Sequence, residues 1–191
     1  MNKAVVGFSM FFYAAVEVLQ AILPSLVAVM LHSLIALLTL DLALASLVLV
    51  PIVFLAVGSA VGGADPLLLT ASLSMLVGAI IYVGVDVVDY AHIALHAGPI
   101  PLLPLYVILS SILFLAGWSL ASAFLLTRIR GTLATVAAIL LLMGYIIGLV
   151  PSIALNTVRL GLGLIQVMSM ISLIGVAFKV AGQLAGGAAV I

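Results

Sequence analysis

The densest group of chemically active side chains lies in residues 66–98, after about twenty apolar residues that are enough to cross a bilayer as one helix. Asp86, Asp89, His92 and His96 follow that run, and at 100° per residue they fall within an arc of about 120° on one helical face. Two imidazoles four residues apart can reach the same metal ion, and Asp89 could add an oxygen ligand or orient an imidazole. The pattern predicts a site for a metal or another cation, with a water-facing polar helix end as the alternative.

His32 extends this candidate site from a neighbouring segment. It could complete the metal set, or it could pair with His92 or His96 as the two axial ligands of a b-type haem. A single haem of this kind would suit a membrane-anchor subunit of a respiratory complex. The candidate cofactors are therefore a divalent metal and, as the alternative, haem b.

Two carboxylates lie inside apolar segments, Glu17 near the middle of the first and Asp41 about two turns into the second. Intramembrane carboxylates usually face the bundle interior and mark a proton or ion route, or they pair with a partner. The alternative for each is a protonated, hydrogen-bonded structural carboxyl. Arg159 is a candidate counter-ion for Asp86 or Asp89, or else an interfacial flank of the last helix.

The composition identifies the class of protein that must position these groups. The chain has 191 residues, of which 68% are hydrophobic and 5% charged, with a mean hydropathy of +1.61; soluble proteins carry roughly 25% charged residues. We therefore expect an all-α integral membrane protein, a single polytopic domain over residues 1–191 in the cell membrane. The scarcity of Asn and Gln also suits a thermophile.

The same composition limits the partners. The net charge is zero and no basic patch stands out, so nucleic acid is excluded as a partner. The lipid bilayer is the expected partner, with other membrane subunits or further copies of the chain as additional candidates. The absence of cysteine excludes disulfides and thiolate metal ligands.

Proline, glycine and charged residues divide the chain into six predicted spans. Pro151 is expected to end the fifth span, Lys179 to mark the interfacial end of the sixth, and the residues after it to form a flexible tail. The predicted spans are roughly residues 4–31, 34–63, 66–97, 101–127, 132–150 and 160–182.

The distribution of basic residues predicts the orientation. With six spans, Lys3, Arg128, Arg130 and Lys179 fall on one side of the membrane and Arg159 on the other. Cytoplasmic loops carry the excess of lysine and arginine. Both termini are therefore predicted to be cytoplasmic, which places the His/Asp group at the outer end of the third helix.

No nucleophile elbow, phosphate loop or dinucleotide motif is present in the sequence, so a function other than catalysis is favoured. The leading hypothesis is a transporter or channel-like protein for protons or a metal cation. In that hypothesis the outer His/Asp cluster is the entrance, and Glu17 and Asp41 are intramembrane steps. The first alternative is the respiratory anchor subunit, and the second is a structural or assembly membrane protein without chemistry of its own.

Overall fold

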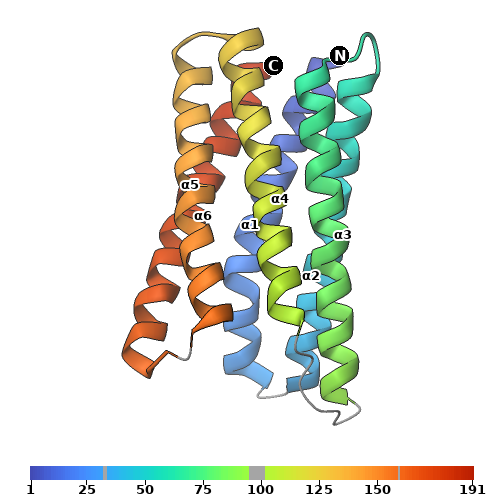
Figure 1. Ribbon diagram of the computed structural model, residues 1–191. Coiled ribbons are helices and arrows are strands. Elements are labelled where there is room, and N and C mark those ends of the chain that lie inside the picture. Colours follow the sequence, from blue (N-terminus) through green and yellow to red (C-terminus); the bar gives the residue numbers. More distant parts are fainter. Residues whose placement is uncertain (32–33, 95–101, 159) are drawn as a thin grey trace.

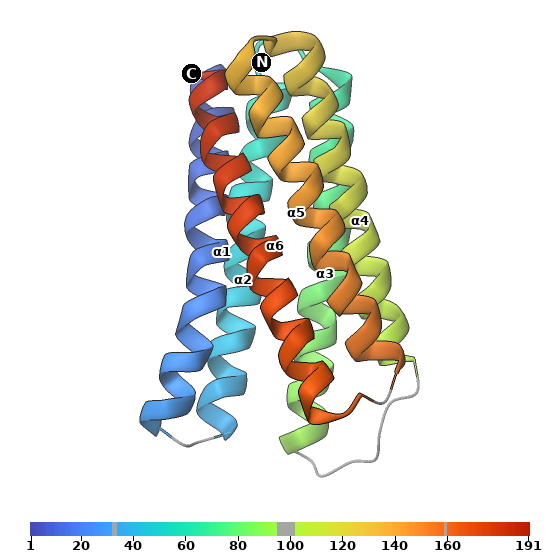
Figure 2. The same cartoon turned by 90° about the vertical axis from the view of Figure 1, so that its left-hand side faces the viewer.

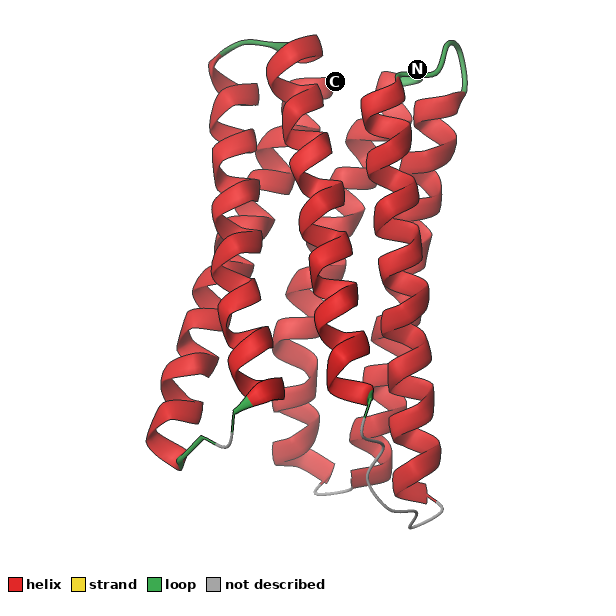
Figure 3. Ribbon diagram, viewed as in Figure 1, coloured by secondary structure: helices red, strands yellow, loops and turns green. Residues whose placement is uncertain are grey.

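Six long helices make up the fold. The computed structural model describes residues 1–31, 34–94, 102–158 and 160–191, and this part of the chain is helical without strands (Figure 3). All six helices are long and apolar enough to span a membrane, which confirms the predicted all-α membrane class. The elements are α1 (Lys3–Leu31), α2 (Leu34–Ala60), α3 (Pro66–Ala94), α4 (Leu103–Phe124) with its π-helical continuation η1 (Leu125–Ile129), α5 (Thr132–Thr157) and α6 (Leu162–Val190).

The helices run alternately up and down and form a closed ring (Figures 1 and 2). Each helix contacts the next one along the chain, and α6 closes the ring by contacting α1. The start of α1 and the end of α6 lie at the same end of the bundle, which we call the terminal end. We call the opposite end, where α1, α3 and α5 finish, the distal end. In the predicted orientation the terminal end is cytoplasmic.

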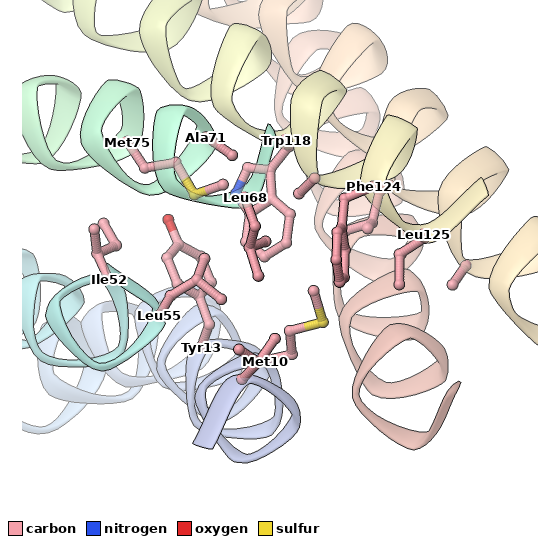
Figure 4. Packing of buried hydrophobic residues seen from close by; sticks show 14 of the residues in the cluster. Met10, Tyr13, Ile52, Leu55, Leu68, Ala71, Met75, Trp118, Phe124 and Leu125 are labelled. Carbon is pink, nitrogen blue, oxygen red and sulfur yellow. The ribbon is translucent and has the colours of Figure 1, made fainter. Parts of the chain in front are cut away.

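Among the described residues, the apolar core is concentrated in the terminal half of the ring. Figure 4 shows part of this core from close by. The core is built from the first half of α1, α3 and α5 and from the last half of α2 and α4, because those halves meet at that end. Its largest fully buried side chains there include Trp118, Phe124, Met10, Ile52, Leu68 and Met75. The terminal half is therefore closed by tightly packed side chains.

Two predicted helix ends are wrong. α5 continues through Pro151 to Thr157, and α6 continues through Lys179 to Val190. Proline is tolerated within membrane helices because neighbouring groups satisfy the freed backbone. Small residues beyond Lys179, such as Gly182 and Gly187, pack closely against other helices instead of forming a flexible tail.

The longer α6 changes the charge count on which the orientation was based. Lys179 lies well inside a span and no longer counts as a loop residue. Lys3, Arg128 and Arg130 still belong to the terminal end, against Arg159, which lies outside the described residues. Lys3, Arg128 and Arg130 still predict that the termini are cytoplasmic, and the orientation stays a prediction. The other helix bounds lie within a few residues of those predicted.

The start of α3 provides a test of how local contacts stabilise the fold. Asp65 accepts hydrogen bonds from the backbone N–H groups of Leu67 and Leu68 at 3.0 and 3.3 Å, and its second oxygen lies 3.1 Å from Nε of the exposed Arg128. Replacing Asp65 with alanine removes the helix cap and should cost about 1 kcal/mol of stability. Replacing Arg128 with alanine removes only an exposed ion pair and should cost less than about 0.5 kcal/mol. Unfolding in detergent measures both, and equal losses would contradict the capping role.

Candidate functional site

Glu17 is the central residue of the 29-residue helix α1, and it is buried. One carboxylate oxygen accepts a hydrogen bond from the hydroxyl of Tyr145 on α5 at 3.1 Å. The other lies 3.5 Å from the ammonium nitrogen of Lys179 on α6. The predicted intramembrane carboxylate thus joins three helices through a hydrogen bond and an ion pair near the middle of the bundle.

Lys179 reaches Glu17 because α5 and α6 pack with almost no space between their backbones. A Cβ atom added at Gly144 would lie 2.6 Å from the backbone nitrogen of Lys179 and 2.9 Å from the carbonyl oxygen of Gly175. This close approach also places the lysine ammonium 4.6 Å from the ring centroid of Tyr145, within the range of a cation–π interaction. The glycines therefore position the charge, as small residues commonly do at membrane helix contacts.

An aromatic layer separates Glu17 from the apolar core. The ring of Trp118 stacks on that of Tyr145 at 5.6 Å and meets Tyr13 edge-on at 5.2 Å. The side-chain amide of Gln183 donates a long hydrogen bond of 3.5 Å to the Tyr145 hydroxyl, which in turn donates to Glu17. The indole N–H of Trp118 and the amide oxygen of Gln183 have no hydrogen-bond partner among the described residues. The layer thus keeps one unused donor and one unused acceptor.

A cavity of about 300 Å³ lies beside Glu17, with side chains from all six helices in its wall. Lys179 and Tyr145 border it with Glu17, and the remaining polar lining consists largely of hydroxyl groups. Two of these hydroxyls, from Ser111 of α4 and Ser152 of α5, lie 2.9 Å apart. The polar lining residues other than Glu17 and Lys179 are Tyr13, Gln20, Tyr82, Ser110, Ser111, Tyr145, Ser152 and Ser172.

A second hollow, of about 450 Å³, joins the first from the side of α1 and α6. We call it the wedge. It shares Glu17, Gln20, Ser172 and Lys179 with the cavity, and its other lining is mainly apolar. α1 and α6 lie together at the terminal end and separate toward the distal end (Figure 2). The Glu17–Lys179 pair therefore lies where the packed terminal half meets the part of the bundle in which the described stretches of α1 and α6 lie apart.

The predicted outer cluster is assembled only in part. Asp86, Asp89 and His92 lie in the last turns of α3 at the distal end and are half-buried. Asp86 lies within electrostatic range of both Asp89 and the exposed Asp41 of α2, and one of its oxygens is buried without a hydrogen-bond partner in the described chain. Acidic side chains therefore lie between Glu17 and the distal end of the bundle.

The metal and haem hypotheses gain no support. No group of three histidine, aspartate or glutamate side chains that could hold one metal ion exists among the described residues. His32, His96 and Arg159 lie outside that part of the chain, so their predicted roles stay predictions. His92 is the one histidine that the structure describes, and the proposed imidazole pair is therefore not seen.

Sequence reasoning missed Lys179, Tyr145 and Gln183 as members of the site. Lys179 was assigned to the membrane interface because a charge after a long apolar run usually marks its end. A usable signal was present nonetheless: Gly175, Lys179, Gly182 and Gln183 recur at helical spacing, which indicates a continuing helix with a small and polar face.

Comparison of the chain with protein-family models, with curated proteins and with solved structures finds no match.

Proposed function

We propose that this six-span helical membrane protein is a small transporter that moves protons across the bilayer, with Glu17 as its proton-binding group. The observation that carries the proposal is a buried carboxylate, halfway along α1, at the wall of a cavity lined by all six helices. Ionisable side chains at such depth are costly and mark ion or proton routes in membrane proteins. Lys179 forms an ion pair with Glu17 at 3.5 Å, and uptake of a proton by the carboxylate would remove that pair, so protonation would alter the contacts between α1 and α6.

The distribution of core and cavity supports a carrier that is open to one side. The cavity and the wedge occupy the middle and distal part of the ring, whereas the terminal half is filled by Trp118, Phe124 and their neighbours. A continuous water-filled channel does not fit this closure. Transport by alternating access, in which one part of the bundle rocks against another around a central site, does.

The charge of Lys179 favours a proton over a metal ion as the transported species. A metal ion held about 4 Å from an ammonium group, with no anion of its own to place at that ammonium, is repelled by about 4 kcal/mol per unit charge at an effective dielectric constant of 20. A divalent ion at Glu17 would meet twice that repulsion, and the described residues offer it no group of ligands. A proton neutralises Glu17 directly and needs no ligand cage. These charges favour protons over metal cations as the transported species.

The acidic groups in the distal half suit an access route for protons. Tyr82 borders the cavity and lies within electrostatic range of Glu17, Asp41 and Asp86. The order of these groups along the bundle, from Asp89 near the end of α3 to Glu17 at mid-depth, gives a series of proton-binding groups. In the predicted orientation, this route begins outside the cell.

Proton flux into proteoliposomes tests the proposal. With a potassium gradient and valinomycin to set the membrane potential and a pH-sensitive dye inside, the wild-type protein should acidify the lumen faster than empty vesicles do. Replacing Glu17 with glutamine should reduce that rate at least tenfold, because the amide cannot exchange a proton. Replacing Asp65 with asparagine, a matched change of an acid outside the cavity that can still cap α3, should leave the rate unchanged.

Two outcomes would contradict the proposal. Unchanged flux in the Glu17→Gln variant would remove Glu17 from the route. A wild-type rate equal to that of empty vesicles, with folded protein in the membrane, would favour the structural or assembly alternative. The respiratory-anchor alternative has no contact among the described residues in its favour.

A further inference from the structure

The wedge between α1 and α6 has a polar inner end and an apolar outer part. Glu17, Lys179, Gln20 and Ser172 form the inner end that it shares with the cavity. The outer part is mainly apolar, and it is lined by Ala21, Leu155, Leu173 and Val176 together with one hydroxyl residue, Ser169. A hollow with this division matches an amphiphile, whose polar head would reach the inner end while its hydrocarbon chains stay outside.

The wedge opens toward lipid because the distal part of α6 lies away from α1 (Figure 2). Near the terminal end α6 contacts α1 closely, and a Cβ atom added at Gly187 would lie 2.9 Å from the carbonyl oxygen of Gly7. At the other end of α6, residues 162–167 are exposed on every face of the helix, and Leu162 is 82% exposed. Apart from Gln166 these residues are apolar or glycine, and apolar side chains exposed around a membrane-spanning helix face hydrocarbon. A molecule from the bilayer can therefore enter the wedge sideways.

The charges at the inner end indicate the kind of head group. Glu17 and Lys179 lie 3.5 Å apart, which exceeds the 2.7–2.9 Å typical of a charge-assisted hydrogen bond. Their side chains are 9% and 18% exposed, so both remain reachable from the wedge. A head group with one ammonium and one phosphate can give each side chain an opposite charge. An apolar helix of a second copy would leave both charges without new partners.

From these observations we infer that the wedge binds a zwitterionic amphiphile of the aminophospholipid class, with its ammonium at Glu17 and its phosphate at Lys179. Such a lipid would be the second substrate of the proposed transporter, and in this respect the inference rests on the proposed function. The wedge has a volume of about 450 Å³, which lies within the range for small-molecule sites.

Binding can be measured through Trp118, the single tryptophan of the chain, which stacks on Tyr145 beside the site. The probes are dioctanoyl phosphatidylethanolamine, dioctanoyl phosphatidylglycerol and free phosphoethanolamine, each titrated into the delipidated protein in detergent. We expect saturable changes in Trp118 emission, with the ethanolamine lipid binding at least tenfold more tightly than either other probe. Equal affinity for the two lipids would overturn the head-group assignment, and equal affinity for free phosphoethanolamine would overturn access from the bilayer.

Variants place the binding in the wedge. Ala21→Phe and, from the facing helix, Val176→Phe should each weaken binding of the ethanolamine lipid at least tenfold by filling the wedge. Val167→Phe, on an exposed face of α6 outside the wedge, is the matched control and should bind as wild type. Glu17→Gln should abolish the preference for ethanolamine over glycerol. Unchanged binding in both wedge variants would overturn the proposed site.

The binding assay and the flux assay can fail separately. Lipid binding without Glu17-dependent proton flux would leave the wedge assignment intact and contradict the transporter. Glu17-dependent proton flux without selective lipid binding would leave the transporter intact and contradict the aminophospholipid.

Discussion

Replacing Lys179 with methionine should lower the free energy of unfolding by about 3 kcal/mol, because it leaves Glu17 buried without its opposite charge. Removing one partner of a buried ion pair typically costs 3–5 kcal/mol. We expect the lower end of this range because the cavity beside the pair is polar and the Tyr145 hydroxyl still donates to Glu17. Equilibrium unfolding of the detergent-solubilised protein, followed by Trp118 fluorescence, measures the loss.

The double variant Glu17→Gln/Lys179→Met separates the pair interaction from the individual side chains. Glu17→Gln alone should cost about as much as Lys179→Met, since it leaves the partly buried Lys179 ammonium without its carboxylate partner. Removing both charges should recover at least half of either loss, because replacing a whole buried pair is often neutral or stabilising. Lys3→Met, at the exposed start of α1, is the control and should change stability by less than about 0.5 kcal/mol.

Additive losses in the double variant would contradict the ion pair between α1 and α6. The double variant also strengthens the flux experiment. If it is as stable as the wild type and carries no proton flux, loss of transport in Glu17→Gln is due to the missing carboxyl group and not to unfolding.

Replacing Gly144 or Gly182 with alanine should destabilise the protein by about 1–3 kcal/mol. The added methyl group would lie 2.6 Å from the Lys179 backbone nitrogen in the first case and 2.7 Å from the Leu141 backbone nitrogen in the second. Backbone atoms of a helix cannot move aside individually, so α5 and α6 must separate, and overpacking of this kind costs 1–3 kcal/mol. The better helix propensity of alanine offsets up to about 1 kcal/mol of the loss.

Gly84→Ala is the matched control because a Cβ atom added there meets nothing within 4 Å. This variant should be as stable as the wild type or slightly more stable. Gly144→Ala should also reduce Glu17-dependent proton flux, since separating α5 from α6 moves Lys179 away from the carboxylate. Equal stability of the Gly84 and Gly144 variants would show that the α5–α6 contact is looser than described.

The sequence by itself determined the class of protein and the number of spans, and it singled out Glu17 as a carboxylate inside a span. A composition with so few charges can be solvated only by lipid, and apolar runs of sufficient length form helices because a bilayer offers the backbone no other hydrogen-bond partners. Glu17 stood out for the same reason, since an acid in the middle of such a run is costly wherever it points.

Only the tertiary structure decided what Glu17 contacts. Tyr145 is 128 residues away along the chain, and no local spacing relates α1 to α5 and α6. The pairing depends on the ring closure between α1 and α6 and on glycines that bring two backbones together. Sequence reasoning emphasised the histidines because their spacing within one helix is readable. The partner of Glu17 was not readable, because it is set by packing between helices that are distant in sequence.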